Sequence, residues 1–187
     1  MNNLIIITSN KNKVKEISAI TGLKLDSADL EIPEIQALDV EEVAREKAIA
    51  AYKIIKKPVI VDDTGLYIEA LGDLPGAFIT WFLKCMGTGG IINLMRGEKN
   101  RRAYVKTCIA YADKNGARTF VGKIKGIIPK KVSGSRGFGW DAIFIPEGYK
   151  KTYSEMSKDE KNSISMRKEA LKKFMTFLSS RKKRQLQ

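Results

Sequence analysis

The order of short apolar segments along the chain constrains the fold more than any other feature. Strand-like and helix-like patterns alternate through residues 4–62, and two long alternating segments, 101–113 and 118–127, follow with the turn sequence DKNG between them. Alternating strands and helices favour parallel pairing, whereas two strands joined by a tight turn form an antiparallel hairpin. We therefore predict an α/β protein with a mixed central sheet.

Two helix starts carry specific capping signals. Asp39 is a good N-cap with Glu42 at the capping-box position, and Ser165 is the expected N-cap of the last helix. The expected strands are 4–8, 24–28, 59–62, 101–113, 118–127 and 143–145. The expected helices end at Gly22, at about Lys56, at about Met95 and beyond Leu178.

Charge and composition limit the class of protein. The formal net charge is +13, which favours anionic partners, but eight Lys and Arg against one Glu from Arg167 onward supply +7 of it. A solvated terminus is the usual meaning of such a run, and a nucleic-acid tether is the less favoured one. The apolar runs are too short to cross a membrane, and two cysteines without metal spacing indicate free thiols in a reducing cytoplasm.

The segment VIVDDTGL places two adjacent carboxylates, Asp62 and Asp63, directly after an expected buried strand. The carboxyl ends of strands are where open α/β sheets bind ligands. A hard cation would relieve the repulsion between the two carboxylates, and Mg²⁺ uses few carboxylates beside substrate phosphates. Glu34, in the loop after Pro33, is a further candidate ligand. A solvated turn explains this stretch equally well when it is taken alone.

Three other segments carry candidate binding residues. TSNKNK, residues 8–13, joins a strand to a helix N-terminus, whose N–H groups favour a phosphate. GSRGFGWD, residues 134–141, combines glycines with two aromatic side chains that could stack on a base. EKNSISMR, residues 160–167, puts two cations beside a helix start. Taken individually, the three segments are more often a helix cap with a surface charge, a turn with core aromatics, and surface charge, respectively. The chain contains no histidine, so any chemistry depends on other groups.

Together the motifs are more specific. In chain order, TSNKNK, EIPEIQ, DDTGLYIEALGDLPGAF, GFGWDAIFIPEGYKKTYSEM and EKNSISMRKEAL resemble the inosine triphosphate pyrophosphatase family, from the first strand to the last helix. The resemblance implies a mixed, strongly twisted central sheet with flanking helices and two lobes around a nucleotide cleft. It implies a single catalytic domain over residues 1–180, followed by a basic tail over 181–187. It also implies a cytoplasmic homodimer without membrane association, and nucleic acid is an unlikely partner.

The implied reaction is Mg²⁺-dependent hydrolysis of ITP, dITP and XTP to the monophosphate and pyrophosphate. By resemblance, Asp63 is a metal ligand and proton acceptor and Glu34 is a second metal ligand, with Asp62 and Lys13 as further catalytic candidates. The sequence leaves open whether Asp62 or Asp63 is the main general base. The implied substrate-binding residues are Thr8, Ser9, Asn10, Lys13, Lys47, Thr64, Phe138, Gly139, Trp140, Asp141, Lys161, Met166 and Arg167.

One departure from the family pattern bears on base selectivity. The family has Ser-His-Arg before its last helix, where this chain has Ser165, Met166 and Arg167. In the family that histidine helps recognise the 6-oxo group of the purine, and a thioether is at best a weak acceptor. We therefore expect relaxed selectivity, with Arg167 remaining as a donor. The alternative is a non-catalytic nucleotide- or nucleic-acid-binding protein on the same fold.

Overall fold

A seven-stranded sheet organises the molecule. The computed structural model describes residues 4–184, and side chains as far as Arg181. The strands lie in the order β2-β1-β3-β5-β6-β7, with the short β4 paired to β3 off this path. β1 runs parallel to β2 and β3, and every other pairing is antiparallel. The predicted mixed α/β fold is confirmed.

The parallel part of the sheet comes first in the chain, and the antiparallel part follows. The strands are β1 (Ile5–Ile7), β2 (Asp26–Ala28), β3 (Val59–Ile68), β4 (Pro75–Gly76), β5 (Arg102–Asp113), β6 (Gly116–Ile127) and β7 (Ile145–Pro146). The α-helices are α1 (Lys11–Thr21), α2 (Val40–Ile55), α3 (Ile79–Leu94), α4 (Lys158–Ile164) and α5 (Met166–Arg184). Short 3₁₀ turns span Glu69–Leu71, Asp141–Ile143 and Tyr153–Glu155.

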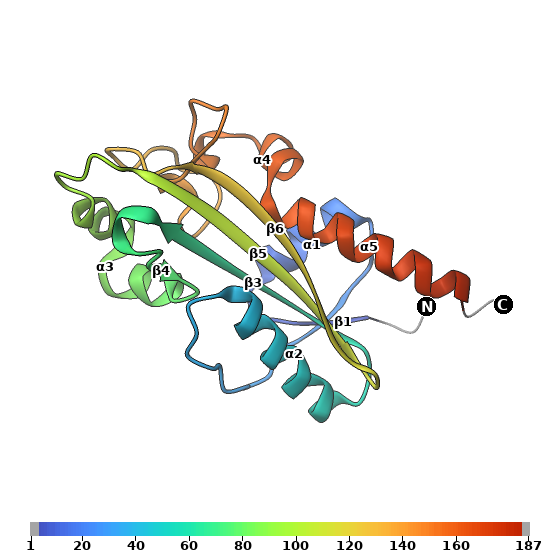
Figure 1. Cartoon of the computed structure of the whole chain (residues 1–187). Coiled ribbons are helices and arrows are strands. Elements are labelled where there is room, and N and C mark those ends of the chain that lie inside the picture. Colours follow the sequence, from blue (N-terminus) through green and yellow to red (C-terminus); the bar gives the residue numbers. More distant parts are fainter. Residues whose placement is uncertain (1–3, 185–187) are drawn as a thin grey trace.

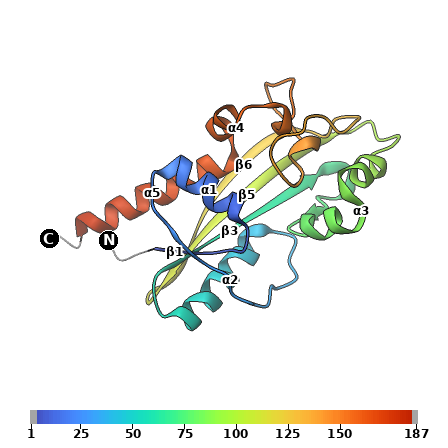
Figure 2. The same ribbon diagram turned by 180° about the vertical axis from the view of Figure 1, so that it is seen from behind.

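Apolar side chains on both faces of the sheet hold the helices in place. α2 packs on one face, where Ala44 and Ala48 meet Val59 and Val61 (Figure 1). α1 and α5 pack together on the opposite face, which Figure 2 shows from behind. A third cluster lies under α3 and the segment 138–156. Because both faces are covered, β3 is apolar on both, as a buried central strand requires.

The helix ends follow the sequence with one correction. Gly22 closes α1 in the left-handed conformation, at φ 69°, which glycine adopts without strain. Asp39 caps α2 by accepting the Glu41 N–H at 2.8 Å, and the expected capping box with Glu42 is not formed. The Asp39 carboxylate is instead shared between the Glu41 N–H and Lys106, whose Nζ lies 2.7 Å from it.

The expected end of the third strand at Asp62 is wrong. β5 pairs with β3 along its whole length, so β3 continues to Ile68. On its other side, β1 pairs only with 59–61 and β4 only with 66–67. Among the described residues, the stretch 62–65 therefore has no strand partner on this edge, and the acidic pair lies at that gap.

Gly65 is the last residue of this unpaired stretch and lies next to the residues that pair with β4. A Cβ at this position would lie 2.8 Å from the Tyr67 ring, 2.9 Å from the Gly76 carbonyl oxygen and 2.9 Å from Val40. These distances are shorter than real Cβ contacts, so only glycine lets β3 pass beneath the start of α2.

Three further boundaries differ from expectation. Residues 141–143 form a 3₁₀ turn and the strand begins at Ile145, because Ile143 N–H closes back on Trp140. α4 precedes the last helix, with Ser157 as its cap. α5 crosses the expected tail boundary, and Arg181 binds Tyr111 and Asp113 on the β5–β6 hairpin. The rest of the predicted tail lies outside the described side chains. No helix within residues 4–184 is long and apolar enough to span a membrane.

Candidate active site

A cleft of about 1030 Å³ lies along the free edge of β3. Its walls come from the start of α1, the 34–37 loop, the first turns of α3, the 138–141 segment and the α4–α5 corner. Twelve of the sequence-predicted residues line it: Asn10, Lys13, Glu34, Asp63, Thr64, Phe138, Gly139, Trp140, Asp141, Lys161, Met166 and Arg167. Thr8, Ser9, Lys47 and Asp62 do not.

Asp62 points away from the cleft, toward α1 and α5. Its side chain is fully buried, and it accepts two hydrogen bonds from Arg167, at 2.7 and 3.1 Å. Lys13 Nζ lies 3.1 Å from Asp62 Oδ1, the oxygen that also accepts from Arg167 Nη2. Burial alone would raise the pKa of this carboxyl, but the charges of Arg167 and Lys13 overcome it and hold the pKa well below its usual range. Asp62 is therefore a fixed anion and a poor proton acceptor.

Asp63 points to the opposite face, since side chains alternate along a strand. Burial raises the pKa of its carboxyl, although Lys13 and Lys47 act to lower it and Glu34 adds to the rise. Its Oδ2 atom is buried without a hydrogen-bond partner in the part of the chain that the structure describes. A buried carboxylate oxygen without a partner is costly, so a ligand or cation at this position would stabilise it.

Glu34 and Lys47 form an ion pair on the α2 side of the cleft. Glu34 is the more exposed partner, and burial would lower the pKa of Lys47, but the Asp63 and Glu34 carboxylates raise it. The structure thus places Lys47 behind Glu34 and not in the cleft lining. This arrangement keeps a cation beside both candidate metal ligands.

The start of α1 is already partly capped. Asn10 accepts hydrogen bonds from the N–H groups of Asn12 and Lys13, at 3.0 and 3.4 Å, and Thr8 accepts from Asn10 at 3.0 Å. These two helix N–H groups are therefore not free for a phosphate. Lys13 Nζ donates to the Asp62 carbonyl oxygen at 2.5 Å and lies 3.9 Å from Asp63, so it spans the free edge of β3.

Arg167 is the centre of a buried ionic network. Besides Asp62, its guanidinium donates to Thr64 Oγ1 at 3.2 Å and to Glu16. Four of its five N–H groups are thus engaged within the protein, which leaves one for a ligand. Sequence reasoning missed Glu16; its place one turn after Lys13 on the same helix face is the signal that could have indicated it.

The segment 138–141 is held by the same network. Lys161 Nζ binds Asp141 at 2.7 Å and Glu16 at 2.9 Å, and lies 4.6 Å from the centre of the Phe138 ring. Asp141 also accepts the Phe138 N–H at 2.8 Å. Burial raises the pKa of Asp141, and the charge of Lys161 opposes this rise. Together these contacts fix Phe138 at the cleft wall.

Met166 begins α5 beside Arg167. It is buried, at 2% exposure, in the cluster that contains Trp140 and Tyr153, and it reaches the cleft lining. The Met166 thioether can pack against a ligand, but it is a poor hydrogen-bonding partner.

None of the cleft residues on α3 was predicted, and there are five: Ile79, Thr80, Trp81, Leu83 and Lys84. Trp81 and Lys84 lie three residues apart on one helix face. A tryptophan in an apolar helical stretch usually indicates a core position, so the sequence carried no signal for its exposure.

The carboxylates fit a magnesium site of a particular kind. Within residues 4–184 no cluster of three or more His, Cys, Asp or Glu side chains could hold a metal alone. Three carboxylates line the cleft. Asp141 is bound to Lys161, whereas Glu34 and Asp63 repel one another, and Asp63 has the partnerless oxygen. Mg²⁺ commonly binds through one or two carboxylates together with substrate phosphates and water. The residues therefore fit an ion that arrives with a phosphate ligand.

Fold and cleft together define a mixed α/β protein whose cleft can bind a multiply charged anion with a metal ion. The family model described as the Ham1 family matches residues 4–177. The chain belongs to the Ham1 family, and the resemblance drawn from its motifs is confirmed.

Relatives and solved structures agree with this placement. A protein of Saccharolobus solfataricus named dITP/XTP pyrophosphatase is 42% identical over 94% of this chain and 93% of its own. A Trypanosoma cruzi protein named inosine triphosphate pyrophosphatase 2 is 42% identical over 89% and 87%. The solved structure of the Staphylococcus aureus Ham1 protein, 27% identical, matches with a TM-score of 0.84 over 96% of this chain and 100% of that one.

Proposed function

We propose that the protein hydrolyses purine nucleoside triphosphates with non-standard bases (ITP, dITP and XTP) to the monophosphate and pyrophosphate, using Mg²⁺. The names of the relatives in Saccharolobus solfataricus and Trypanosoma cruzi support this reaction class. The observation that carries the proposal is the buried Asp63 oxygen without a partner, at the free edge of β3 in a cleft lined by cations.

Glu34 and Asp63 are the side chains that would hold the metal. When bound, Mg²⁺ supplies positive charge to the phosphates and offsets the repulsion between the carboxylates. Lys47 keeps Glu34 oriented through their ion pair, and Lys13 anchors the backbone beside Asp63.

Asp63 is the proton acceptor in this proposal, and Asp62 is its structural neighbour. Water attacks the α-phosphorus, the bond to the β-phosphate oxygen breaks, and pyrophosphate leaves. The attacking water gives its proton to the Asp63 carboxylate, which burial makes more basic than an exposed aspartate. Asp62 cannot share this role because Arg167 and Lys13 hold it as an anion on the other face.

The purine lies on the side of Phe138 and Met166 in this proposal. The Phe138 ring offers a stacking surface that Lys161 supports from one side. Met166 stands in place of the family histidine, and four of the five Arg167 N–H groups are engaged within the protein. One Arg167 N–H group is therefore the main side-chain donor left to recognise a 6-oxo group. We therefore propose that the preference for ITP over ATP is narrower than in relatives with the histidine.

Location and assembly belong to the same proposal. The enzyme works as a homodimer on the nucleotide pool of the cytoplasm. Both cysteines, the exposed Cys85 and the buried Cys108, are free thiols, which supports a reducing compartment.

The test is a panel of triphosphates with coupled pyrophosphatase and phosphate detection. ITP, XTP, dITP, ATP and GTP are compared with Mg²⁺ and with EDTA. We expect phosphate that depends on the coupling enzyme, because cleavage next to the α-phosphorus releases pyrophosphate. Phosphate without the coupling enzyme would indicate γ-cleavage and contradict the proposal. Saturable binding without any product would favour the non-catalytic binding protein.

A further inference from the structure

The cations that line the cleft differ in one respect. Lys13, Lys161 and Arg167 are each tied to a carboxylate of the protein, at 3.1, 2.7 and 2.7 Å. Lys84 lines the same cleft, and no carboxylate lies within ion-pair distance of it in the described part of the chain. Its charge is therefore available to an anionic ligand without breaking an ion pair.

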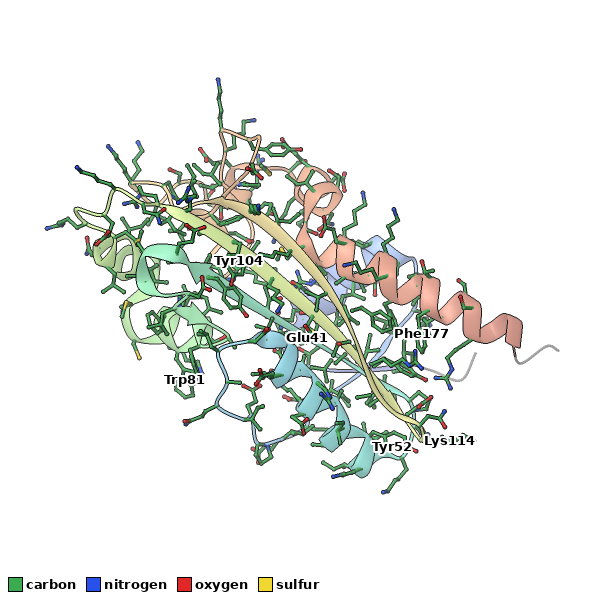
Figure 3. The ribbon with its side chains drawn as sticks, viewed as in Figure 1. Glu41, Tyr52, Trp81, Tyr104, Lys114 and Phe177 are labelled. Atoms are coloured by element: carbon green, nitrogen blue, oxygen red, sulfur yellow. The ribbon has the colours of Figure 1, made fainter. Side chains whose placement is uncertain are left out.

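Lys84 is held against an exposed aromatic ring. Its Nζ lies 4.8 Å from the centre of the Trp81 ring, one turn earlier on α3. Trp81 is 62% exposed, the highest value among the large apolar side chains of the described residues, whereas Trp140 in the same cleft is 7% exposed. Figure 3 shows Trp81 extending from α3 toward the loop that precedes α2.

Covering an exposed tryptophan side chain with a bound ligand lowers the free energy of the complex, because its apolar surface leaves water. Burying a large apolar side chain is favourable, and the indole face binds cations and stacks on planar groups. A nucleoside triphosphate carries both kinds of partner, since its phosphates match a lysine and its nucleoside part matches an indole.

We propose that Trp81 and Lys84 contact the bound nucleotide, Lys84 through a phosphate and Trp81 by covering the nucleoside. This inference rests on the proposed function and adds α3 as a second binding wall, next to the segment that carries Phe138. It makes Lys84 a cation that can bind a phosphate without giving up a carboxylate partner, in addition to the paired Lys13, Lys161 and Arg167.

Tryptophan fluorescence tests the role of Trp81 directly. Acrylamide quenching is measured with and without saturating ITP in EDTA, on the wild type and on Trp81→Phe, which leaves only Trp140. We expect ITP to lower the quenching constant of the wild type at least twofold and to leave that of Trp81→Phe nearly unchanged. If ITP leaves wild-type quenching unchanged at saturation, the inference is wrong. Low quenching without nucleotide that rises on dilution would instead place Trp81 between two copies of the chain, which also overturns it.

Kinetics test the role of Lys84. Lys84→Met should raise the KM for ITP about tenfold with kcat within about twofold, because it removes an ion pair to the substrate. Lys57→Met is the matched control, since it removes the same charge from an exposed site outside the cleft and should change KM less than twofold. Equal effects in both variants would indicate general electrostatic steering and contradict the inference.

The two proposals fail separately. If the wild type hydrolyses no triphosphate, the proposed function is wrong, whatever the quenching shows. If it hydrolyses ITP while Trp81 stays equally quenched and Lys84→Met keeps a wild-type KM, only the α3 contact is wrong.

Discussion

Asp62 and Asp63 are adjacent aspartates, and the structure predicts opposite results for the same substitution in each. Asp62→Asn removes a fully buried charge and turns an amide group toward the donors of Arg167. Breaking a buried ion pair from one side costs about 3–5 kcal/mol. For a chain of 187 residues, with a shift of ~2–4 °C per kcal/mol, the melting temperature should fall by about 6–20 °C.

Asp63→Asn should leave the fold intact and abolish most of the activity. Its Oδ2 makes no hydrogen bond within the described residues, and its nearest cation, Lys13, is 3.9 Å away. Losing this charge removes little attraction and also some repulsion from Glu34. The free energy of unfolding should change by less than about 1 kcal/mol. Loss of a general base lowers kcat by about 10²–10⁴-fold.

The assay is a thermal melt by circular dichroism at pH 7 together with ITP turnover for both variants. The pH matters because the pKa of Asp62 is lowered in the fold. Its stabilisation is fully present above the unfolded value near 4 and is lost as the pH falls below it. Adding Arg167→Met to Asp62→Asn should recover part of the lost stability. In Asp62→Asn the buried Arg167 keeps only the Glu16 carboxylate beside Lys13, and this second substitution removes the excess positive charge. Similar melting temperatures for the two single variants, or near-native turnover in Asp63→Asn, would refute the division of roles.

Four further outcomes are expected. Met166→His should widen the ITP-to-ATP ratio of kcat/KM about tenfold, or ~1.4 kcal/mol, and an unchanged ratio would make Met166 mere packing. Because burial raises the pKa of Asp63, kcat/KM should fall with decreasing pH at a value above 3.8, and an acid limb at or below 3.8 would exclude Asp63 as the base. Lys13→Ala should raise the KM for ITP about tenfold, and an unchanged KM would count against its phosphate role. Arg181→Ala should lower the melting temperature by about 1–4 °C through loss of the Asp113 pair, with turnover unchanged; a large loss of turnover would place this turn of α5 at the active site.

The residues that sequence analysis placed in the cleft were those whose motif fixes a local conformation. Asp63 and Thr64 directly follow the apolar run 59–61 within β3, and Phe138 belongs to a glycine-rich segment, so their positions depend mainly on neighbouring residues. The role of Asp62 was harder to predict from the sequence, because no neighbouring residue distinguishes Asp62 from Asp63. Its role depends on Arg167, 105 residues further along the chain.

The end of β3 and the α3 wall could not be predicted for a similar reason. The continuation of β3 depends on pairing with β5, a partner about 40 residues away in sequence. The exposure of Trp81 depends on which helix face α3 turns to the cleft, and an apolar helix with Gly87 at its kink gives no clear face. Tertiary pairing decided both features.

Gly65 has a consequence for the register of the whole sheet. β3 carries Val59 and Val61 on one face and Ile60 on the other, so a slip of one residue would still bury apolar side chains on both faces. The slip would also still present an aspartate on each face of the sheet, because Asp62 and Asp63 would each point to the opposite face. Neither hydrophobicity nor charge therefore rejects the shifted pairing. A shift in either direction would bring Thr64 or Leu66 to the point where a Cβ meets Val40 and the Gly76 carbonyl at 2.9 Å, and this collision does reject it. A residue without a side chain thus decides which of the two aspartates faces the cleft.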